Sequence, residues 1–156
     1  MAGSRVEIRG LREFQRELSK VDRSLLNELR TVHRKVSDLI GNRARAAMGA
    51  SGSAKAARAI KSRATSKSAF LDTVAKPPYA LGVIWGQRKR SGWYSNPRYA
   101  SSTGRQFSDW VGNQWDPGEH GGEPYYIGPA IDASLDEVER IYLEGIDDLT
   151  RRAFPD

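Results

Sequence analysis

Apolar residues recur at helical spacing near the start of this 156-residue chain. A first stripe, with intervals of three, four and three residues, contains Leu11, Phe14, Leu18 and Val21. A second, longer stripe contains Leu25, Leu29, Val32, Val36, Leu39 and Ile40. Because such spacing puts side chains on one side of a helix, we predict either a helix pair or one long helix. A break is expected at Asp22, whose short side chain can cap the following helix.

The last part of the chain has the pattern of an acidic amphipathic helix that begins at Pro129 and reaches about Phe154. Its apolar face is expected to contain Ile131, Leu135, Val138, Tyr142 and Leu149. Its first turns carry Asp132, Asp136, Glu137 and Glu139. Arg151 and Arg152 occupy its last turn, so the charges at both ends match the helix dipole.

Residues 59–86 have the pattern of a small antiparallel sheet. Residues 60–65 and 70–75 are predicted to pair as strands through a turn at 66–68. A helical alternative stays open for the start of this region. On a helix, three cations spaced by three residues would form one ridge: Lys55, Arg58 and Lys61.

The same region continues with the pair Pro77-Pro78, which favours extended backbone. The apolar run Ala80–Trp85 follows and is closed by Gly86. We predict that this run is a third, buried strand of the sheet.

Residues 87–124 are rich in Gly, Ser, Asn and Pro but also hold several large aromatic residues. This composition is too aromatic for a disordered linker and too interrupted for long helices or strands. We predict a long inserted loop that orders against a partner, the alternative being a loop packed on its own domain. The aromatic residues expected to face a partner are Trp93, Tyr94, Tyr99, Trp110 and Trp115.

These elements predict an α+β fold. A long N-terminal helix or helix pair and an acidic C-terminal helix are expected to pack on the small antiparallel sheet. With 38% hydrophobic residues, 1–156 fits one compact domain.

Charge is strongly segregated along the chain, which carries a net charge of +6. Residues 1–50 hold 11 Lys/Arg against 6 Asp/Glu, and residues 51–107 hold 11 against 1. Residues 108–156 reverse this balance, with 3 against 12. Such a chain can attract copies of itself head to tail, and its basic part can face a polyanion. This pattern favours an assembly component over a solitary enzyme.

The search for catalytic or cofactor chemistry is largely negative. The sequence contains no nucleophile elbow, phosphate-binding loop or dinucleotide fingerprint, and the absence of cysteine excludes thiolate metal sites. Asp116, Glu119 and His120 could offer two carboxylates and an imidazole to a metal, but their spacing fits no known site. No enzyme activity and no cofactor are expected. With no secretion signal or membrane span, a soluble protein is expected.

The basic middle of the chain is the candidate for contact with DNA. Lys and Arg side chains can neutralise phosphates independently of sequence, and no motif for reading bases is present. A solvated face, or pairing with the acidic helix of a neighbour, is the competing interpretation. The residues expected to face DNA or a channel are Lys55, Arg58, Lys61, Arg63 and Lys67.

The order of several short segments resembles the gene-product-ten-like tail-component family of long-tailed phages. A short strand leads into a helix at 6–14, and a basic, Ala-rich segment follows. The segment 79–86 (YALGVIWG), matching a Tyr-Ala…Gly strand of the family, and the segment 125–131 (YYIGPAI), opening the terminal helix, then occur in the family's order. The similarity spans most of the chain except about 87–120, which departs from the family as an insertion.

The resemblance implies a structural protein of the virion neck or tail-completion ring, made in the host cytoplasm and located at the head-to-tail junction. It implies a ring of copies, a hexamer or dodecamer, in contact with other connector and tail proteins and with the double-stranded DNA in the channel. The acidic residues of the last helix would meet cations of an adjacent subunit. Two alternatives stay open: a free DNA-binding protein that uses residues 55–67, and a metal-dependent nuclease at Asp116, Glu119 and His120.

Overall fold

A computed structural model describes residues 8–86 and 124–155 of the chain. It begins with a helix pair, and the predicted break at Asp22 is confirmed. The Asp22 carboxylate accepts a hydrogen bond from the Ser24 amide (2.7 Å), which lowers the pKa of Asp22. The two helices on either side of this break are α1 (Leu11–Val21) and α2 (Ser24–Met48).

A β-hairpin follows α2 after a short helical connection. Its strands pair antiparallel with Ile60 opposite Thr73 and Ala64 opposite Ala69, and the Thr65 amide donates to the Ser68 carbonyl across the turn. This arrangement confirms the two strands and the turn predicted at 60–75. The elements are η1 (Gly49–Ser53), α3 (Ala54–Ala57), β1 (Ile60–Ala64) and β2 (Ala69–Thr73).

The predicted third strand is wrong, because Ala80–Trp85 forms the short helix α4. A short apolar run has no alternation that distinguishes a strand from a buried helix. Here the buried positions Ala80, Val83 and Ile84 follow the helical intervals of three and four. Gly86 ends the helix with a φ of 81°, a conformation that glycine adopts without strain.

The C-terminal region forms two helices, α5 (Ile127–Asp132) and α6 (Leu135–Ala153), where one was predicted. The buried Ser134 lies at their junction and donates its hydroxyl hydrogen to the Ala130 carbonyl (2.6 Å). Most of the predicted apolar face is inside, but Leu135 is 45% exposed. The break between α5 and α6 explains the exposure of Leu135. The apolar spacing that starts in α5 does not continue on the same side of α6.

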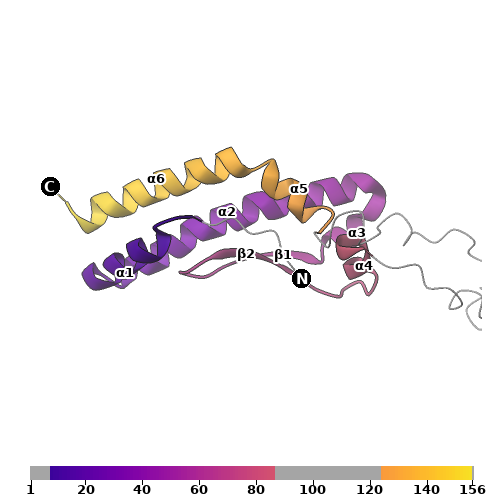
Figure 1. Cartoon of the computed structure of the whole chain (residues 1–156). Coiled ribbons are helices and arrows are strands. Elements are labelled where there is room, and N and C mark those ends of the chain that lie inside the picture. The colour runs from indigo at the N-terminus through magenta and orange to yellow at the C-terminus, as the bar shows by residue number, and fades with distance from the viewer. Residues whose placement is uncertain (1–7, 87–123, 156) are drawn as a thin grey trace, which may run out of the picture.

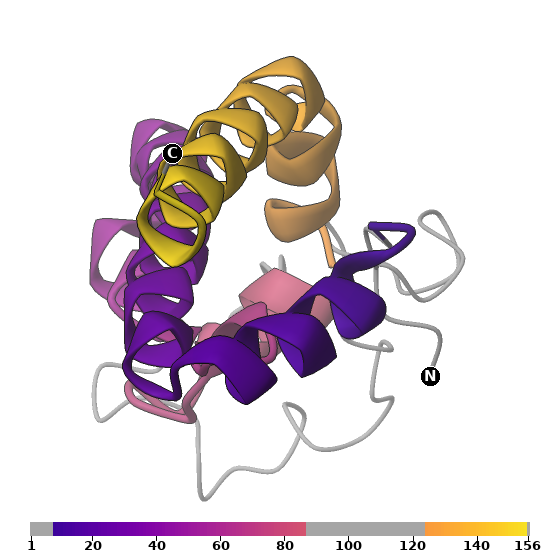
Figure 2. The same ribbon diagram turned by 90° about the vertical axis from the view of Figure 1, so that its left-hand side faces the viewer.

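Helix α2 lies between the hairpin on one side and α5–α6 on the other (Figure 1). Viewed from the end, α1 crosses close to the hairpin (Figure 2), where the Gln15 amide donates to the Ser66 and Lys67 carbonyls. The largest fully buried apolar side chains are Leu29, Met48, Ile60 and Ile84. Helices packed on a two-stranded antiparallel sheet confirm the α+β class.

Candidate assembly surfaces

The side of α6 that faces away from α2 is acidic and carries one prominent apolar residue. Leu143 is 63% exposed, and the helical repeat places Glu139 and Asp147 one turn before and after it. Asp132, Asp136 and Glu139 are exposed and form no ion pair with any described residue. We call the exposed side chains of Asp136, Glu139, Leu143 and Asp147 the acidic face. Asp147 pairs with Arg151 of the same helix (2.7 Å), and the exposed Arg140 projects from the same side of α6.

Glu137, the fourth acidic residue expected at a subunit contact, already has a partner in its own chain. Its carboxylate pairs with Arg43 of α2, whose guanidinium also donates to the Ala133 carbonyl and the Ser134 hydroxyl (both 2.7 Å). One forked side chain therefore satisfies three acceptors at the α5–α6 junction. This cluster fixes the direction in which α6 presents its acidic face.

The five cations expected to face DNA or a channel are all exposed, but they lie on different elements. The single helical ridge is wrong, because α3 ends at Ala57 and Lys61 already lies in β1. Arg63 pairs with Asp72 across the hairpin (3.2 Å), which leaves four cations without an ion pair to a described residue. These four are Lys55, Arg58, Lys61 and Lys67.

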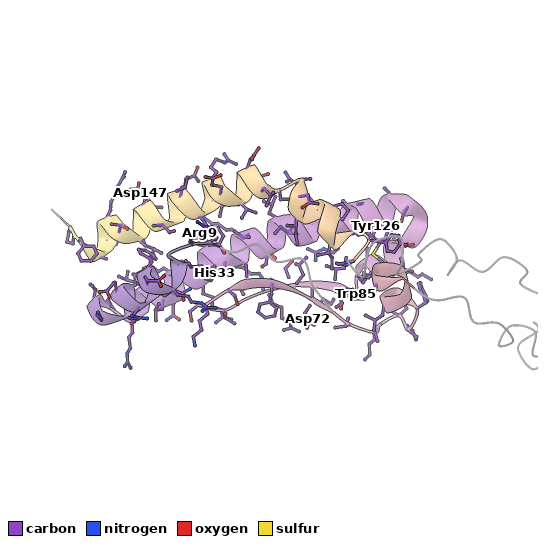
Figure 3. All side chains as sticks on the ribbon, in the orientation of Figure 1. Arg9, His33, Asp72, Trp85, Tyr126 and Asp147 are labelled. Atoms are coloured by element: carbon purple, nitrogen blue, oxygen red, sulfur yellow. The ribbon has the colours of Figure 1, made fainter. Side chains whose placement is uncertain are left out.

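The acidic face and the hairpin cations lie on opposite sides of α2. Asp147 projects from the side of α6 away from α2, and Asp72 from the far side of the hairpin (Figure 3). Lys61 stands opposite Asp72 in the antiparallel register and therefore shares its side of the sheet. The charge separation seen along the sequence is thus also a separation in space.

Helix α1 adds a cationic surface that the sequence analysis did not single out. Arg9, Arg12 and Arg16 are exposed and have no ion pair within residues 8–86 and 124–155. Arg12 and Arg16, four residues apart within α1, lie on one side of the helix, a spacing that was visible in the sequence, while Arg9 precedes the helix.

A cavity of about 1080 Å³ lies between α1, β2 and the α5–α6 pair. Its lining mixes polar and apolar surface, and the apolar part includes Val36 and Ile40 from α2 and Leu71 from β2. Charged residues at its edge include Arg9, Arg12, Glu13 and Lys67. We call this feature the α1–β2 groove. No signal in the sequence predicted it, because the residues that line it come from distant segments.

His33 joins three elements in the interior. Its Nδ1 lies 2.7 Å from the Thr65 carbonyl in the hairpin turn, and its ring meets the Tyr142 ring edge-on at 5.6 Å. Since a carbonyl only accepts, Nδ1 carries the hydrogen, and the buried Nε2 has no hydrogen-bond partner. Burial lowers the pKa of His33, although the bond to Thr65 opposes this, and burial raises the pKa of Tyr142 to about 12.

Several predicted site residues lie outside the described residues. These are the candidate metal ligands Asp116, Glu119 and His120, and the aromatic residues Trp93, Tyr94, Tyr99, Trp110 and Trp115. The backbone at either end of 87–123 meets directly, since the Tyr125 amide donates to the Ile84 carbonyl (2.8 Å).

Within the described residues, no group of three or more His, Asp or Glu side chains is placed to hold a metal ion. In the same part of the chain, no helix combines the length and apolar character needed to cross a membrane. Comparison with known proteins finds no matching family model, no similar curated protein and no similar solved structure.

Proposed function

We propose that this chain is a structural subunit of a phage head-to-tail connector, in which copies form a neck or tail-completion ring around the DNA channel. The observation that carries this proposal is the pair of oppositely charged surfaces on the two sides of α2. Subunits with different, complementary surfaces associate head to tail and close into rings when the rotation between them permits. The virion location rests on the segment order that resembles the tail-component family, in which the segment 79–86 is a strand, whereas here it contains α4.

In this proposal the acidic and the basic surfaces have different binding partners. The acidic face of α6 contacts an adjacent subunit, while Lys55, Arg58 and Lys61 face the channel and the DNA phosphates. Exposed lysines on a short helix and a hairpin suit this role, because phosphate attraction needs charge and no fixed geometry. A channel lined in this way holds DNA loosely and lets it pass.

The location is tested by immunogold labelling of purified phage particles from the source, together with a mass-spectrometric census of their proteins. We expect label confined to the head-to-tail junction and a copy number suited to a ring. Absence from intact particles would contradict the proposal.

The second candidate is a free DNA-binding protein, favoured by the four exposed cations that form no ion pair with a described residue: Lys55, Arg58, Lys61 and Lys67. Arg58→Glu and Lys61→Glu separate the two functions. A ring subunit loses head-to-tail joining while its free form has little DNA affinity to lose. A free DNA-binding protein instead binds at about micromolar affinity or tighter, with a steep salt dependence that both variants weaken.

A further inference from the structure

The α1–β2 groove has the chemistry of a docking site for an acidic, amphipathic helix. Its interior presents Leu71, Trp85 and Ile131, which are only partly buried, while Arg9, Arg12 and Lys67 contribute cations to its lining. Close to Lys67, Phe70 is 43% exposed. An occupant that suits this site brings apolar side chains for the interior and carboxylates for the cations.

The acidic face of α6 has this composition. Leu143 is the most exposed large hydrophobic residue in the described structure, and Glu139 and Asp147 flank it at one-turn intervals. An apolar centre with a polar rim is the general arrangement of a protein–protein interface.

We propose, on the basis of the ring function above, that α6 of one copy docks by its acidic face into the α1–β2 groove of the next copy. The groove and the acidic face are two different surfaces of one copy. Val138 and Tyr142, on the buried side of α6, line the groove, whereas Leu143 is exposed on another side of that helix. The contact between copies is therefore head to tail. Each copy therefore offers one groove and one acidic face. Leu143 is the anchor, and Arg9, Arg12 and Lys67 pair with Asp136 and Glu139, the two carboxylates of the acidic face that form no ion pair with a described residue.

The absence of native cysteine makes cross-linking between copies a direct test. One population carries Arg140→Cys, beside Leu143 on α6, and a second carries Ser68→Cys, which lines the groove beside Lys67. Both changes leave the proposed anchor and its pairing charges in place, and the mixture is treated with a short bis-maleimide. We expect a heterodimer in several-fold higher yield than from the matched mixture of Arg140→Cys with Ser24→Cys, because Ser24 is an exposed serine outside the groove. Equal yields from Ser68 and Ser24 would overturn the docking site.

Charge reversal provides a second readout. Arg12→Glu and Glu139→Arg should each weaken self-association about tenfold, and mixing the two variants should restore contacts between unlike copies. No recovery in the mixture would contradict the pairing even if both variants fold. Rings that form without preferential cross-linking at Ser68 would remove the groove proposal and leave the ring function intact. A chain that stays monomeric at all concentrations would remove both.

Discussion

At the scale of single residues, His33 links stability to pH. The neutral ring fits its buried position, whereas protonation would place a hydrogen on Nε2 where no acceptor faces it. Because the folded-state pKa lies below the ordinary value of 6.5, the unfolded chain binds more protons between these two values. The stabilisation is therefore complete above pH 6.5 and is lost as the pH falls toward the folded-state pKa.

We predict that His33→Gln reduces the pH dependence of stability in the window below pH 6.5, while leaving the hydrogen bond to Thr65 possible. Urea unfolding midpoints at half-unit pH steps measure the effect. The wild-type midpoint should fall across this window and the variant's should change less. Equal slopes for the two proteins would show that other groups cause the dependence.

Gly145 allows α6 to approach α2 closely. A Cβ built at this position would lie 2.5 Å from Cγ2 and 2.9 Å from Cγ1 of Val32, a stiff β-branched side chain. We predict that Gly145→Ala lowers the free energy of unfolding by about 1–2 kcal/mol, because overpacking outweighs the gain in helix propensity. Gly49→Ala is the control, since its Cβ meets nothing within 4 Å. Gly49→Ala should be neutral or slightly stabilising. Thermal unfolding of both variants and of the wild type measures the two effects.

At the scale of elements, the Arg43 cluster sets how α5 and α6 attach to α2. Lysine keeps the charge at this position but lacks the fork that reaches the Ala133 carbonyl, Ser134 and Glu137 together. We predict that Arg43→Lys lowers the free energy of unfolding by about 1–2 kcal/mol in urea titrations. Arg34→Lys, which alters the exposed pair with Asp38, should cost less than about 0.5 kcal/mol. Equal losses would mean that Arg43 acts only as a surface charge.

The sequence predicts the helices and the hairpin because their signals are local. The break at Asp22 and the 60–75 hairpin depend on neighbouring residues, and the structure confirms both. The helix at Ala80–Trp85 and the exposure of Leu135 depend on packing and on a break in register, which apolar spacing alone does not contain. Single cations can be identified in a sequence. The groove beside Arg9, Arg12 and Lys67 cannot, because it forms only when distant segments fold against one another.

At the scale of the whole molecule, the central position of α2 turns a charge gradient along the sequence into two separate surfaces. The hairpin follows α2 and packs on one of its sides, whereas α6 comes at the end of the chain and packs on the other. Among the described residues, no cation of the middle segment forms an ion pair with a carboxylate of the last segment. These cations and carboxylates can instead attract one another between two copies, and this attraction is the physical basis of the proposed ring.

This arrangement predicts that the position of a charge change matters more than its size. Glu139→Lys and Glu17→Lys alter the net charge equally, but Glu139 lies on the acidic face and Glu17 on α1, beside its partner Lys20. We expect Glu139→Lys to weaken self-association about tenfold at low salt and Glu17→Lys to change it less than about threefold. The difference should shrink as added salt shortens the Debye length to about 10 Å at 0.1 M. Sedimentation velocity at two salt concentrations measures both effects. Equal weakening by the two variants would mean that overall charge, and not a defined contact on α6, governs association.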